Sequence, residues 1–356
     1  MKPISDLSEV KWGYCTHVLG QALYEGELHA TPISESDEPP QPNDVMLARV
    51  GEIDHHKRIE LHSTRPATLY EGDLVGVAFG YRYATRQFEG IVPNTVDECH
   101  MLSVGGVCGQ VIGAAPQMGM PTRLLPVAYV TDSSGTRVNL RRFGRSPAIA
   151  DTPTTIVVVG SSMDSGKTTA TAAIVRGLSL TGRRVCAGKI TGTGSAKDLL
   201  TMKDAGAFRT LGFTDVGHAS TARASADELV HLWRTIQSNL ALHRPDYIVL
   251  EIADGIVQRE TKMLLDYFSQ QQNVDHFVYC CCDTLGVPLG VTRLRTLGLP
   301  LAAVSGMVTI SPLAANEARE HTDVPVVSVD ELRTPEVANL FPTRRSRASA
   351  AIAAIV

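Results

Sequence analysis

The fold is decided by one stretch of the chain, which reads Ile156-Val157-Val158-Val159-Gly160-Ser161-Ser162-Met163-Asp164-Ser165-Gly166-Lys167-Thr168-Thr169. β-Branched residues typical of a buried strand come first, a glycine-bounded loop follows, and a helix-like stretch begins after Gly-Lys-Thr. This order is that of a P-loop, whose backbone N–H groups and helix N-terminus bind a polyphosphate. We expect Lys167 on the β- and γ-phosphates and the Thr168 hydroxyl on Mg²⁺. The expected nucleotide-binding residues are Gly160, Ser162, Asp164, Ser165, Gly166, Lys167, Thr168 and Thr169.

Composition narrows the class of protein. The chain has 356 residues, which predicts two domains. Its formal net charge of -4 gives no reason to expect binding to nucleic acid or to an anionic membrane. No apolar run reaches membrane-spanning length, and residues 1–6 do not resemble a signal peptide. The seven cysteines lack metal-like spacing, so we expect a reduced, cytoplasmic protein.

The two halves of the chain have different patterns. Residues 1–148 are β-rich, with expected strands at 45–50, 58–62 and 74–79, and this spacing predicts a small barrel or sandwich. Residues 154–340 alternate between strands and helices, which predicts an α/β domain whose parallel sheet carries helices on both faces. Residues 341–356 are expected to form a tail. The expected strands are 155–159, 184–189, 246–252, 276–282 and 301–304, and the expected helices are 168–180, 197–211, 226–242, 259–271 and 290–297.

Further polar residues follow the expected strands of this domain. Lys189 ends the second strand, where a lysine could stabilise charge on a transferred phosphoryl group, and Thr191 and Thr193 lie in the glycine-rich loop beyond it. Glu251 ends an apolar strand and is expected to serve Mg²⁺ or to polarise an attacking group. Asp198 and Asp204 compete for a second position in the Mg²⁺ shell.

A loop at residues 213–221 is rich in short polar side chains. His218 is either a general base or a structural histidine. Asp215, Ser220 and Thr221 either orient a substrate or cap the helix that follows. In the first half, residues 80–90 form either a ligand-binding loop or a hairpin with aromatic cross-strand pairs, and His55-His56 is expected to lie at the surface.

Residues 154–335 resemble the dethiobiotin synthetase-like group of P-loop proteins. Three places carry the resemblance: the long loop in which Gly160 precedes Gly-Lys-Thr by six residues, Gly188-Lys189 before a Thr/Gly loop, and Leu250-Glu251-Ile252-Ala253-Asp254-Gly255. The resemblance implies that Lys167 and Lys189 serve phosphates, and that Thr168, Glu251 and one of the two aspartates serve Mg²⁺. The chain is also similar to an uncharacterised P-loop family with a Thr-Gly loop after the second strand.

These features lead to two functional hypotheses. The first is an ATP- and Mg²⁺-dependent biosynthetic enzyme, a kinase or a ligase with an acyl-phosphate intermediate, whose catalytic residues are Lys167, Lys189, Glu251 and His218. It would activate a small-molecule substrate held by Thr191, Thr193, Asp215, Ser220 and Thr221. The second is a nucleotide-switched accessory NTPase for cofactor assembly. The sequence does not decide between ATP and GTP. A homodimer is expected, because related P-loop proteins often pair across the active site.

Overall fold

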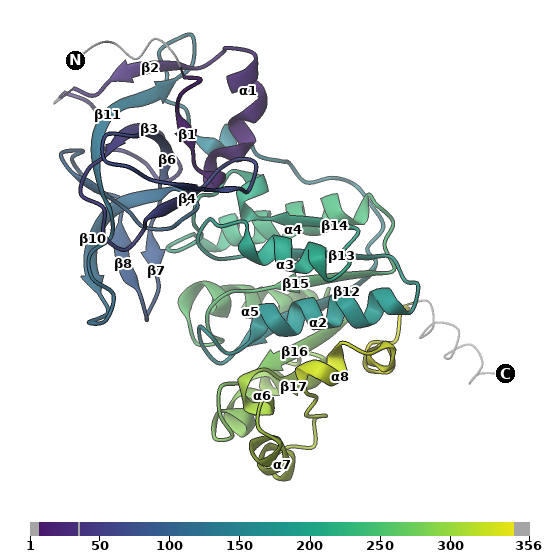
Figure 1. Ribbon diagram of the computed structural model, residues 1–356. Helices are drawn as coiled ribbons and strands as arrows, with labels where there is room; N and C mark the ends of the chain where they lie inside the picture. Colours follow the sequence, from purple (N-terminus) through teal and green to yellow (C-terminus); the bar gives the residue numbers. More distant parts are fainter. Residues whose placement is uncertain (1–6, 35, 345–356) are drawn as a thin grey trace. The chain divides into compact units, whose positions relative to one another are not determined.

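The computed structural model describes residues 7–34 and 36–344, and its chain divides into two compact units (Figure 1). Unit 1 contains the described residues up to Ser146 together with Gly192–Ala196 and Phe213–Arg223. Unit 2 contains Pro147–Thr191, Lys197–Gly212 and residues 224–344. The domains expected at 1–148 and 154–340 were continuous ranges, whereas unit 1 also includes these two loop segments.

Unit 1 is a β-barrel, one of the two architectures expected. Within the described residues its nine-stranded sheet closes on itself, because β6 pairs with β3 on one side and with β10 on the other. The ring runs through β6, β3, β11, β9 and β10, and one buried apolar cluster takes side chains from all five strands, among them Met46, Val77 and Leu124. The strands are β1 Lys11–Trp12, β2 His29–Pro32, β3 Val45–Val50, β4 Arg58–Glu60, β5 Pro66–Thr68, β6 Leu74–Phe79, β7 Arg82–Tyr83, β8 Phe88–Ile91, β9 Cys99–Met101, β10 Val107–Ala114 and β11 Arg123–Thr131, and the helices are η1 Tyr14–Leu19, α1 Gly20–Tyr24 and η2 Leu140–Arg142.

Unit 2 is the expected α/β domain. Its described residues include a parallel six-stranded sheet in the order β14-β13-β15-β12-β16-β17. The strands are β12 Thr154–Gly160, β13 Val185–Lys189, β14 Arg209–Gly212, β15 Tyr247–Glu251, β16 His276–Cys280 and β17 Leu301–Ser305. The helices are α2 Lys167–Leu180, α3 Lys197–Asp204, η3 Phe213–Val216 (a unit 1 segment), α4 Ala226–Ala241, α5 Arg259–Gln271, α6 Gly286–Thr296, η4 Met307–Thr309, α7 Pro312–Glu320, α8 Val329–Leu332 and η5 Pro335–Leu340.

Both faces of this sheet are buried. All seven residues of β12 are buried, and successive side chains of a strand point to opposite faces, so apolar residues are needed on each side. Helices α2 and α3 cover one face and α4 and α5 the other (Figure 1). Ile156 and Val158 pack into the core cluster that contains Ile174 and Leu178 of α2. The apolar stripe of α4, including Trp233, supplies the opposite layer.

Three differences from the sequence-based expectation go beyond shifts at the ends of elements. Residues 209–212 form the edge strand β14, although the helix was expected to run to 211; after Gly206, with its positive φ of 108°, the chain turns into an extended segment. His56 is buried, because its ring packs against Phe88. The expected tail begins too early, since Phe341 is fully buried and its carbonyl accepts a hydrogen bond from the Tyr247 hydroxyl.

Other expectations are resolved or fall outside the structure. Residues 80–90 form the β7–β8 hairpin, which pairs Arg82 with Gly90 and Tyr83 with Glu89. All seven cysteines lie within the described ranges, and none forms a disulfide. The N-terminal segment 1–6 and the tail 345–356 lie outside the described residues. No helix in the described part of the chain combines the length and the apolar character needed to cross a membrane.

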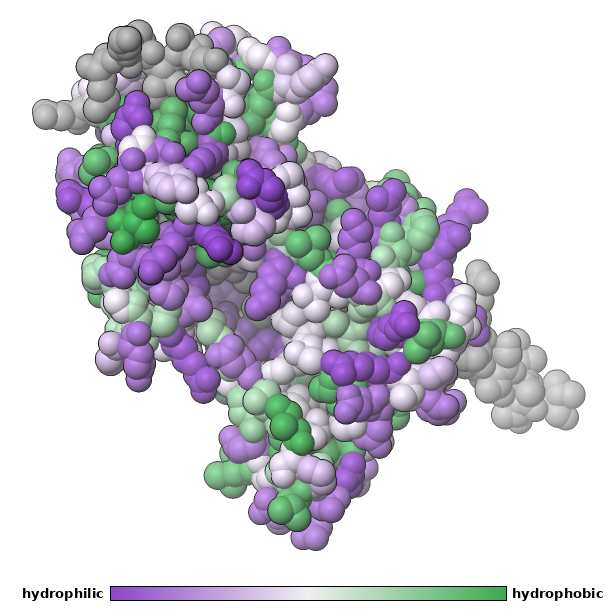
Figure 2. Space-filling model, viewed as in Figure 1, coloured by the Kyte–Doolittle hydropathy of each residue, from purple (hydrophilic) through white to green (hydrophobic). Residues whose placement is uncertain are grey.

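The surface of unit 2 is mostly polar, with apolar patches over α6 and α7 (Figure 2). Leu285, Leu289 and Leu313 contribute exposed side chains there. Isolated exposed apolar residues are common on folded proteins, so these positions need no partner to explain them.

The aromatic contact between α4 and α5 should dominate the stability of that layer. Phe268 is 1% exposed and its ring lies 4.6 Å from that of Trp233. We predict that Phe268→Ala lowers the free energy of unfolding of unit 2 by about 3–5 kcal/mol, since it leaves a cavity. Urea denaturation followed by Trp fluorescence would measure this. Leu313→Ala, at an 81% exposed position, is the matched control, and an equal loss in both variants would contradict the prediction.

Candidate functional site

The phosphate loop connects β12 to α2 with a conformation that depends on glycine. Gly166 precedes the helix with φ 90°, in the left-handed region that a side chain disfavours. A Cβ atom added at Gly160 would lie 2.2 Å from Ser165 Oγ and 2.9 Å from Lys167 Cδ. The bare Cα of Gly160 therefore makes room for the Lys167 side chain to fold back over the loop.

Lys167 is held inside this loop. Its side chain is buried, and Nζ donates a hydrogen bond of 2.7 Å to the Ser162 carbonyl. Burial lowers the pKa of Lys167, and the nearby carboxylate of Glu251 opposes that shift. An anion bound by the loop would favour the charged ammonium, so the arrangement suits a phosphate ligand.

Glu251 contacts candidate residues from two other elements, Thr168 and Lys189. It ends β15, beside Val158 of β12 on one side and Lys189 of β13 on the other. The residue is 1% exposed, and its Oε1 accepts hydrogen bonds of 3.1 Å from Thr168 Oγ1 and 3.1 Å from Lys189 Nζ. The second oxygen, Oε2, is buried without a hydrogen-bond partner. A buried carboxylate oxygen without a partner is costly, which points to a ligand at this position.

Lys189 lies between two acids. Its ammonium pairs with Asp198, in the first turn of α3, and with Glu251. Burial by itself lowers the pKa of Lys189, but the two carboxylates outweigh burial and raise it, so the side chain is charged. Asp204 is exposed at the last residue of α3, about 9 Å along the helix axis from Asp198. The structure thus brings Asp198 to the site and leaves Asp204 outside it.

These residues fit a magnesium ion. The Thr168 hydroxyl, the unpartnered oxygen of Glu251 and the Asp198 carboxylate are hard oxygen donors of the kind that Mg²⁺ prefers. Among the described residues, no cluster of three or more His, Cys, Asp or Glu side chains could hold a metal ion. Mg²⁺ in phosphate sites uses one or two carboxylates and completes its shell with phosphate and water, so this small donor set is compatible with it.

Sequence reasoning missed several residues that shape the loop. The Met307 N–H donates to the Ser165 carbonyl at 3.1 Å, and Gly306, with φ 91°, leaves space for that contact. Cys282 Sγ lies 3.3 Å from Ser162 Oγ. These residues follow β17 and β16, the next strands across the sheet. Their position after the strands could have indicated them, because the ligands of parallel sheets bind at the carboxyl ends of the strands.

The remaining candidate residues are divided between the units. Thr191, in unit 2, uses its hydroxyl to accept a hydrogen bond from the Ala253 N–H at 2.9 Å, so it braces the turn after β15. Thr193, Asp215, His218, Ser220 and Thr221 belong to unit 1.

Within unit 1 these residues secure two loop segments. Thr193 and Ser220 form a β-bridge, and Thr221 Oγ1 accepts a hydrogen bond of 2.8 Å from the Gly192 N–H. His218 is buried. Helix α4 is capped by Ser225 with Glu228, so the capping alternative considered for Asp215, Ser220 and Thr221 is not the one used.

Asp215 has a partner that the sequence did not reveal. His17 Nε2 lies 3.3 Å from Asp215 Oδ1, and the His17 ring stacks on Tyr14 at 4.8 Å. Burial, together with the Asp215 carboxylate, raises the pKa of Tyr14 to about 12. Because η1 and residue 215 are far apart in the sequence, no local pattern links them.

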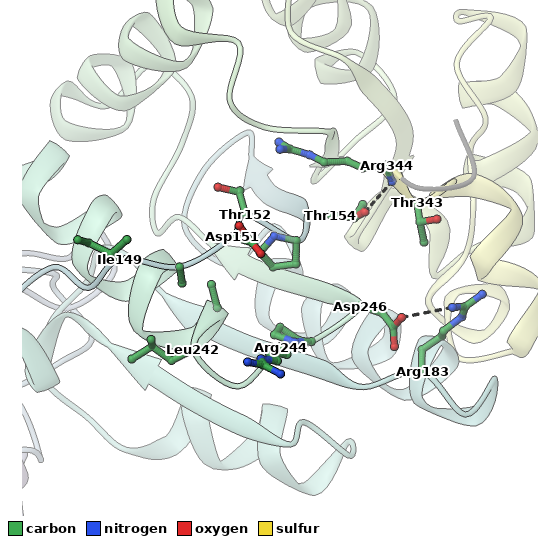
Figure 3. Close-up of a pocket in the computed structure, with 14 residues that line it drawn as sticks. Ile149, Asp151, Thr152, Thr154, Arg183, Leu242, Arg244, Asp246, Thr343 and Arg344 are labelled. Atoms are coloured by element: carbon green, nitrogen blue, oxygen red, sulfur yellow. Dashed lines mark hydrogen bonds and ion pairs between the residues drawn. The ribbon is translucent and has the colours of Figure 1, made fainter. Parts of the chain in front are cut away.

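A separate cavity of about 1150 Å³ opens at the other end of the sheet in unit 2 (Figure 3). It is lined by residues at the amino-terminal ends of the strands, including Thr154 of β12, Arg183 before β13 and Asp246 before β15. An ion pair of 3.3 Å joins Arg183 to Asp246. None of the phosphate-loop residues lines this cavity, so it is distinct from the candidate site.

The decisive combination is a parallel sheet whose strand β12 leads through a Gly-Lys-Thr loop into α2, with an acid at the end of the adjacent strand. Unit 2 has the fold of a P-loop NTPase.

The similarities of this chain to known proteins are distant. No protein-family model matches the sequence, and no curated protein matches it. Among solved structures, the signal recognition particle 54 kDa protein from Aeropyrum pernix, in complex with GDP, is 16% identical with a TM-score of 0.36, covering 55% of this chain and 47% of that one. The signal recognition particle receptor FtsY from Elizabethkingia anophelis is 17% identical with a TM-score of 0.35, covering 58% and 74%.

A DUF1611 family protein from Anabaena variabilis is also similar, at 14% identity and a TM-score of 0.38, covering 57% of this chain and 62% of that protein. The chain spans about half the length of the Aeropyrum pernix protein that it matches. Similarities this distant carry no argument about activity, so the P-loop NTPase assignment rests on the sheet and the loop described above.

The steric role of Gly160 can be tested directly. We predict that Gly160→Ala weakens Mg²⁺–nucleotide binding at least about tenfold, since a displacement of Lys167 or Ser165 need cost only about 1.4 kcal/mol to do so. Isothermal titration calorimetry with ATP and with GTP would measure the affinity. Gly20→Ala is the control, because an added Cβ there meets nothing within 4 Å. Unchanged affinity in Gly160→Ala would show that the loop does not bind phosphate as described.

Proposed function

We propose that this protein is a Mg²⁺-dependent P-loop enzyme that transfers the terminal phosphoryl group of a nucleotide to a small-molecule substrate. ATP is the proposed nucleotide, with GTP as the alternative, and a kinase or an acyl-phosphate-forming ligase of the dethiobiotin synthetase-like group is the proposed type of enzyme. The observation that carries the proposal is the second lysine: Lys189 lies with Thr168 on the same oxygen of Glu251.

This arrangement supports transfer because it concentrates positive charge where phosphoryl transfer develops negative charge. Lys167 lies at the start of α2 and Lys189 at the end of β13. The Glu251 carboxylate acts to raise the pKa of both lysines. Fixed cations around the transferred group stabilise its transition state without reorganisation. Bound Mg²⁺ would add charge neutralisation on the phosphates.

Each residue then has a distinct role. Lys167 binds the phosphates, and Thr168 and Glu251 hold the metal ion. Lys189 loosens its ion pairs with Asp198 and Glu251 and contacts the transferred phosphoryl group or an anionic substrate instead. Asp254, whose pKa is raised by burial against the opposing charges of Lys167 and Lys189, adds a carboxyl group at the turn after β15.

A second candidate function is a nucleotide-switched accessory NTPase. The observation that favours it is the path of the chain: the loops that follow β13 and β14 belong to unit 1, although both strands belong to unit 2. A change of state at the end of β13 could therefore be passed to unit 1 through the backbone. The small-molecule substrate, the homodimer and the roles of His218 and Asp215 stay predictions.

Steady-state turnover tests the two functions against each other. We predict low basal hydrolysis of ATP or GTP that rises sharply with one pool of small metabolites, because transfer needs an acceptor. Lys167→Ala should abolish turnover through lost phosphate binding, whereas Lys189→Ala should lower kcat by about 10²-fold with little change in nucleotide affinity, in keeping with the loss of one transition-state donor. Measurements would use purified protein, Mg²⁺ and a coupled phosphate or nucleoside-diphosphate assay.

Arg176→Ala is the control for loss of a positive charge, at an exposed position of α2. Steady hydrolysis that no metabolite pool alters would rule out the transferase and favour the accessory NTPase. Turnover that survives Lys167→Ala would refute both.

The carboxylate of Glu251 can be examined through its metal dependence. Glu251→Gln keeps the shape of the side chain but removes its charge, so we predict that half-maximal turnover requires at least about tenfold more Mg²⁺, a cost of about 1.4 kcal/mol. A titration of activity with Mg²⁺ would show this shift. Asp204→Asn serves as the control, since Asp204 is exposed at the end of α3. Identical Mg²⁺ curves for Glu251→Gln and the unaltered protein would disprove the metal-binding role.

A further inference from the structure

Five residues of unit 1 interrupt the nucleotide site along the chain. The segment Gly192–Ala196 belongs to unit 1, whereas Thr191 before it and Lys197 after it belong to unit 2. Lys189 precedes the segment by three residues, and Asp198 follows it by two. The two members of the Lys189–Asp198 ion pair are therefore the two ends of one short loop whose middle is held by the barrel unit.

The carboxylate of Glu60 holds the end of this segment. Glu60 is the last residue of β4, and both of its oxygens are used: Oε1 accepts a hydrogen bond of 3.2 Å from Ser195 Oγ, and Oε2 accepts one of 2.9 Å from the Ala196 N–H. Hydrogen bonds to a charged acceptor are stronger than those between neutral groups. They end two residues before Asp198, which leaves that aspartate little freedom.

The middle of the segment is fixed by close backbone packing within unit 1. Ser103 Oγ donates to the Gly194 carbonyl at 3.0 Å, and the Gly194 N–H donates to the Ala219 carbonyl at 2.8 Å. A Cβ added at Gly105 would lie 2.1 Å from Gly194 O. With its backbone fixed in this way, the loop presents its two ends at a set separation.

From these contacts we propose that Glu60 is a positioning residue that sets the Lys189–Asp198 pair for phosphoryl transfer by clamping the loop between them. Glu60 acts through the backbone and touches neither nucleotide nor metal. The inference rests on the proposed function, because it assigns Lys189 its catalytic task. It also gives the segment 192–196 a role, because its anchored backbone holds Lys189 and Asp198 at the two ends of one short loop.

The test combines kinetics with a double-mutant cycle. Glu60→Gln keeps the size of the side chain but has only one accepting oxygen, so we expect kcat to fall about tenfold, equivalent to about 1.4 kcal/mol of barrier. Nucleotide affinity should stay within about twofold, since a residue that acts through the transition state changes kcat more than ground-state binding. Ser195→Ala, which removes one of the two hydrogen bonds, should show a smaller loss. Glu52→Gln, at an exposed position of the same unit, is the control.

Coupling to Lys189 separates positioning from general stability. In a Lys189→Ala background, Glu60→Gln should cause no further loss of kcat, because the group that it positions is already absent. Additive losses would overturn the proposal, and so would an unchanged kcat in Glu60→Gln. If Lys189→Ala itself leaves turnover unchanged, the proposed catalytic role of Lys189 fails, and the result is distinguishable from a failure of Glu60.

A readout independent of activity completes the test. In protein labelled with ¹³C at lysine Cε, the resonance of Lys189, assigned with Lys189→Arg, should shift in Glu60→Gln and stay in place in Glu52→Gln. An unmoved Lys189 resonance in folded Glu60→Gln protein, with its thermal transition intact, would overturn the positioning role whatever the activity shows.

Discussion

The nucleotide site depends on one buried carboxylate. Glu251 ends the strand between β12 and β13, and a single oxygen of its side chain receives the Thr168 hydroxyl from α2 and the Lys189 ammonium from β13. An unpaired charge at this depth would be expensive, so the acid, the hydroxyl and the lysine require one another. The parallel sheet makes the convergence possible, because it brings the carboxyl ends of three strands to one edge.

Three glycines in and beside the phosphate loop allow the backbone and Lys167 to pack closely there. Gly160 leaves room for Lys167 to fold back, and Gly166 takes the left-handed conformation from which α2 starts. Gly306, after β17, leaves space for a hydrogen bond from the next residue to the Ser165 carbonyl. Each is a place where the backbone must approach closely or turn in a way that a side chain would resist.

The chain of unit 1 is not continuous in sequence, because two of its segments lie between strands of unit 2. Segments that follow β13 and β14 are part of its packing, fastened by Glu60, Ser103 and Asn43, whose side chain accepts a hydrogen bond of 2.8 Å from the Ala219 N–H. The strands that form the phosphate site therefore continue directly into the core of another unit.

The sequence by itself determined most elements of the α/β domain and the phosphate loop, since both depend on local patterns: four consecutive β-branched residues, a glycine-bounded loop and Gly-Lys-Thr are contiguous, and Glu251 ends an apolar run. It also named Asp198 and Asp204 as the two candidates for a second Mg²⁺ ligand. Only the tertiary structure showed that Asp198 pairs with Lys189 at the end of β13 and that Asp204 is exposed, because this depends on which residue of α3 faces that strand. Likewise, only the tertiary structure shows that Glu60 bonds to Ser195 and His17 to Asp215, since hydrogen bonds across 135 and 198 residues follow from packing and leave no periodic pattern in the sequence.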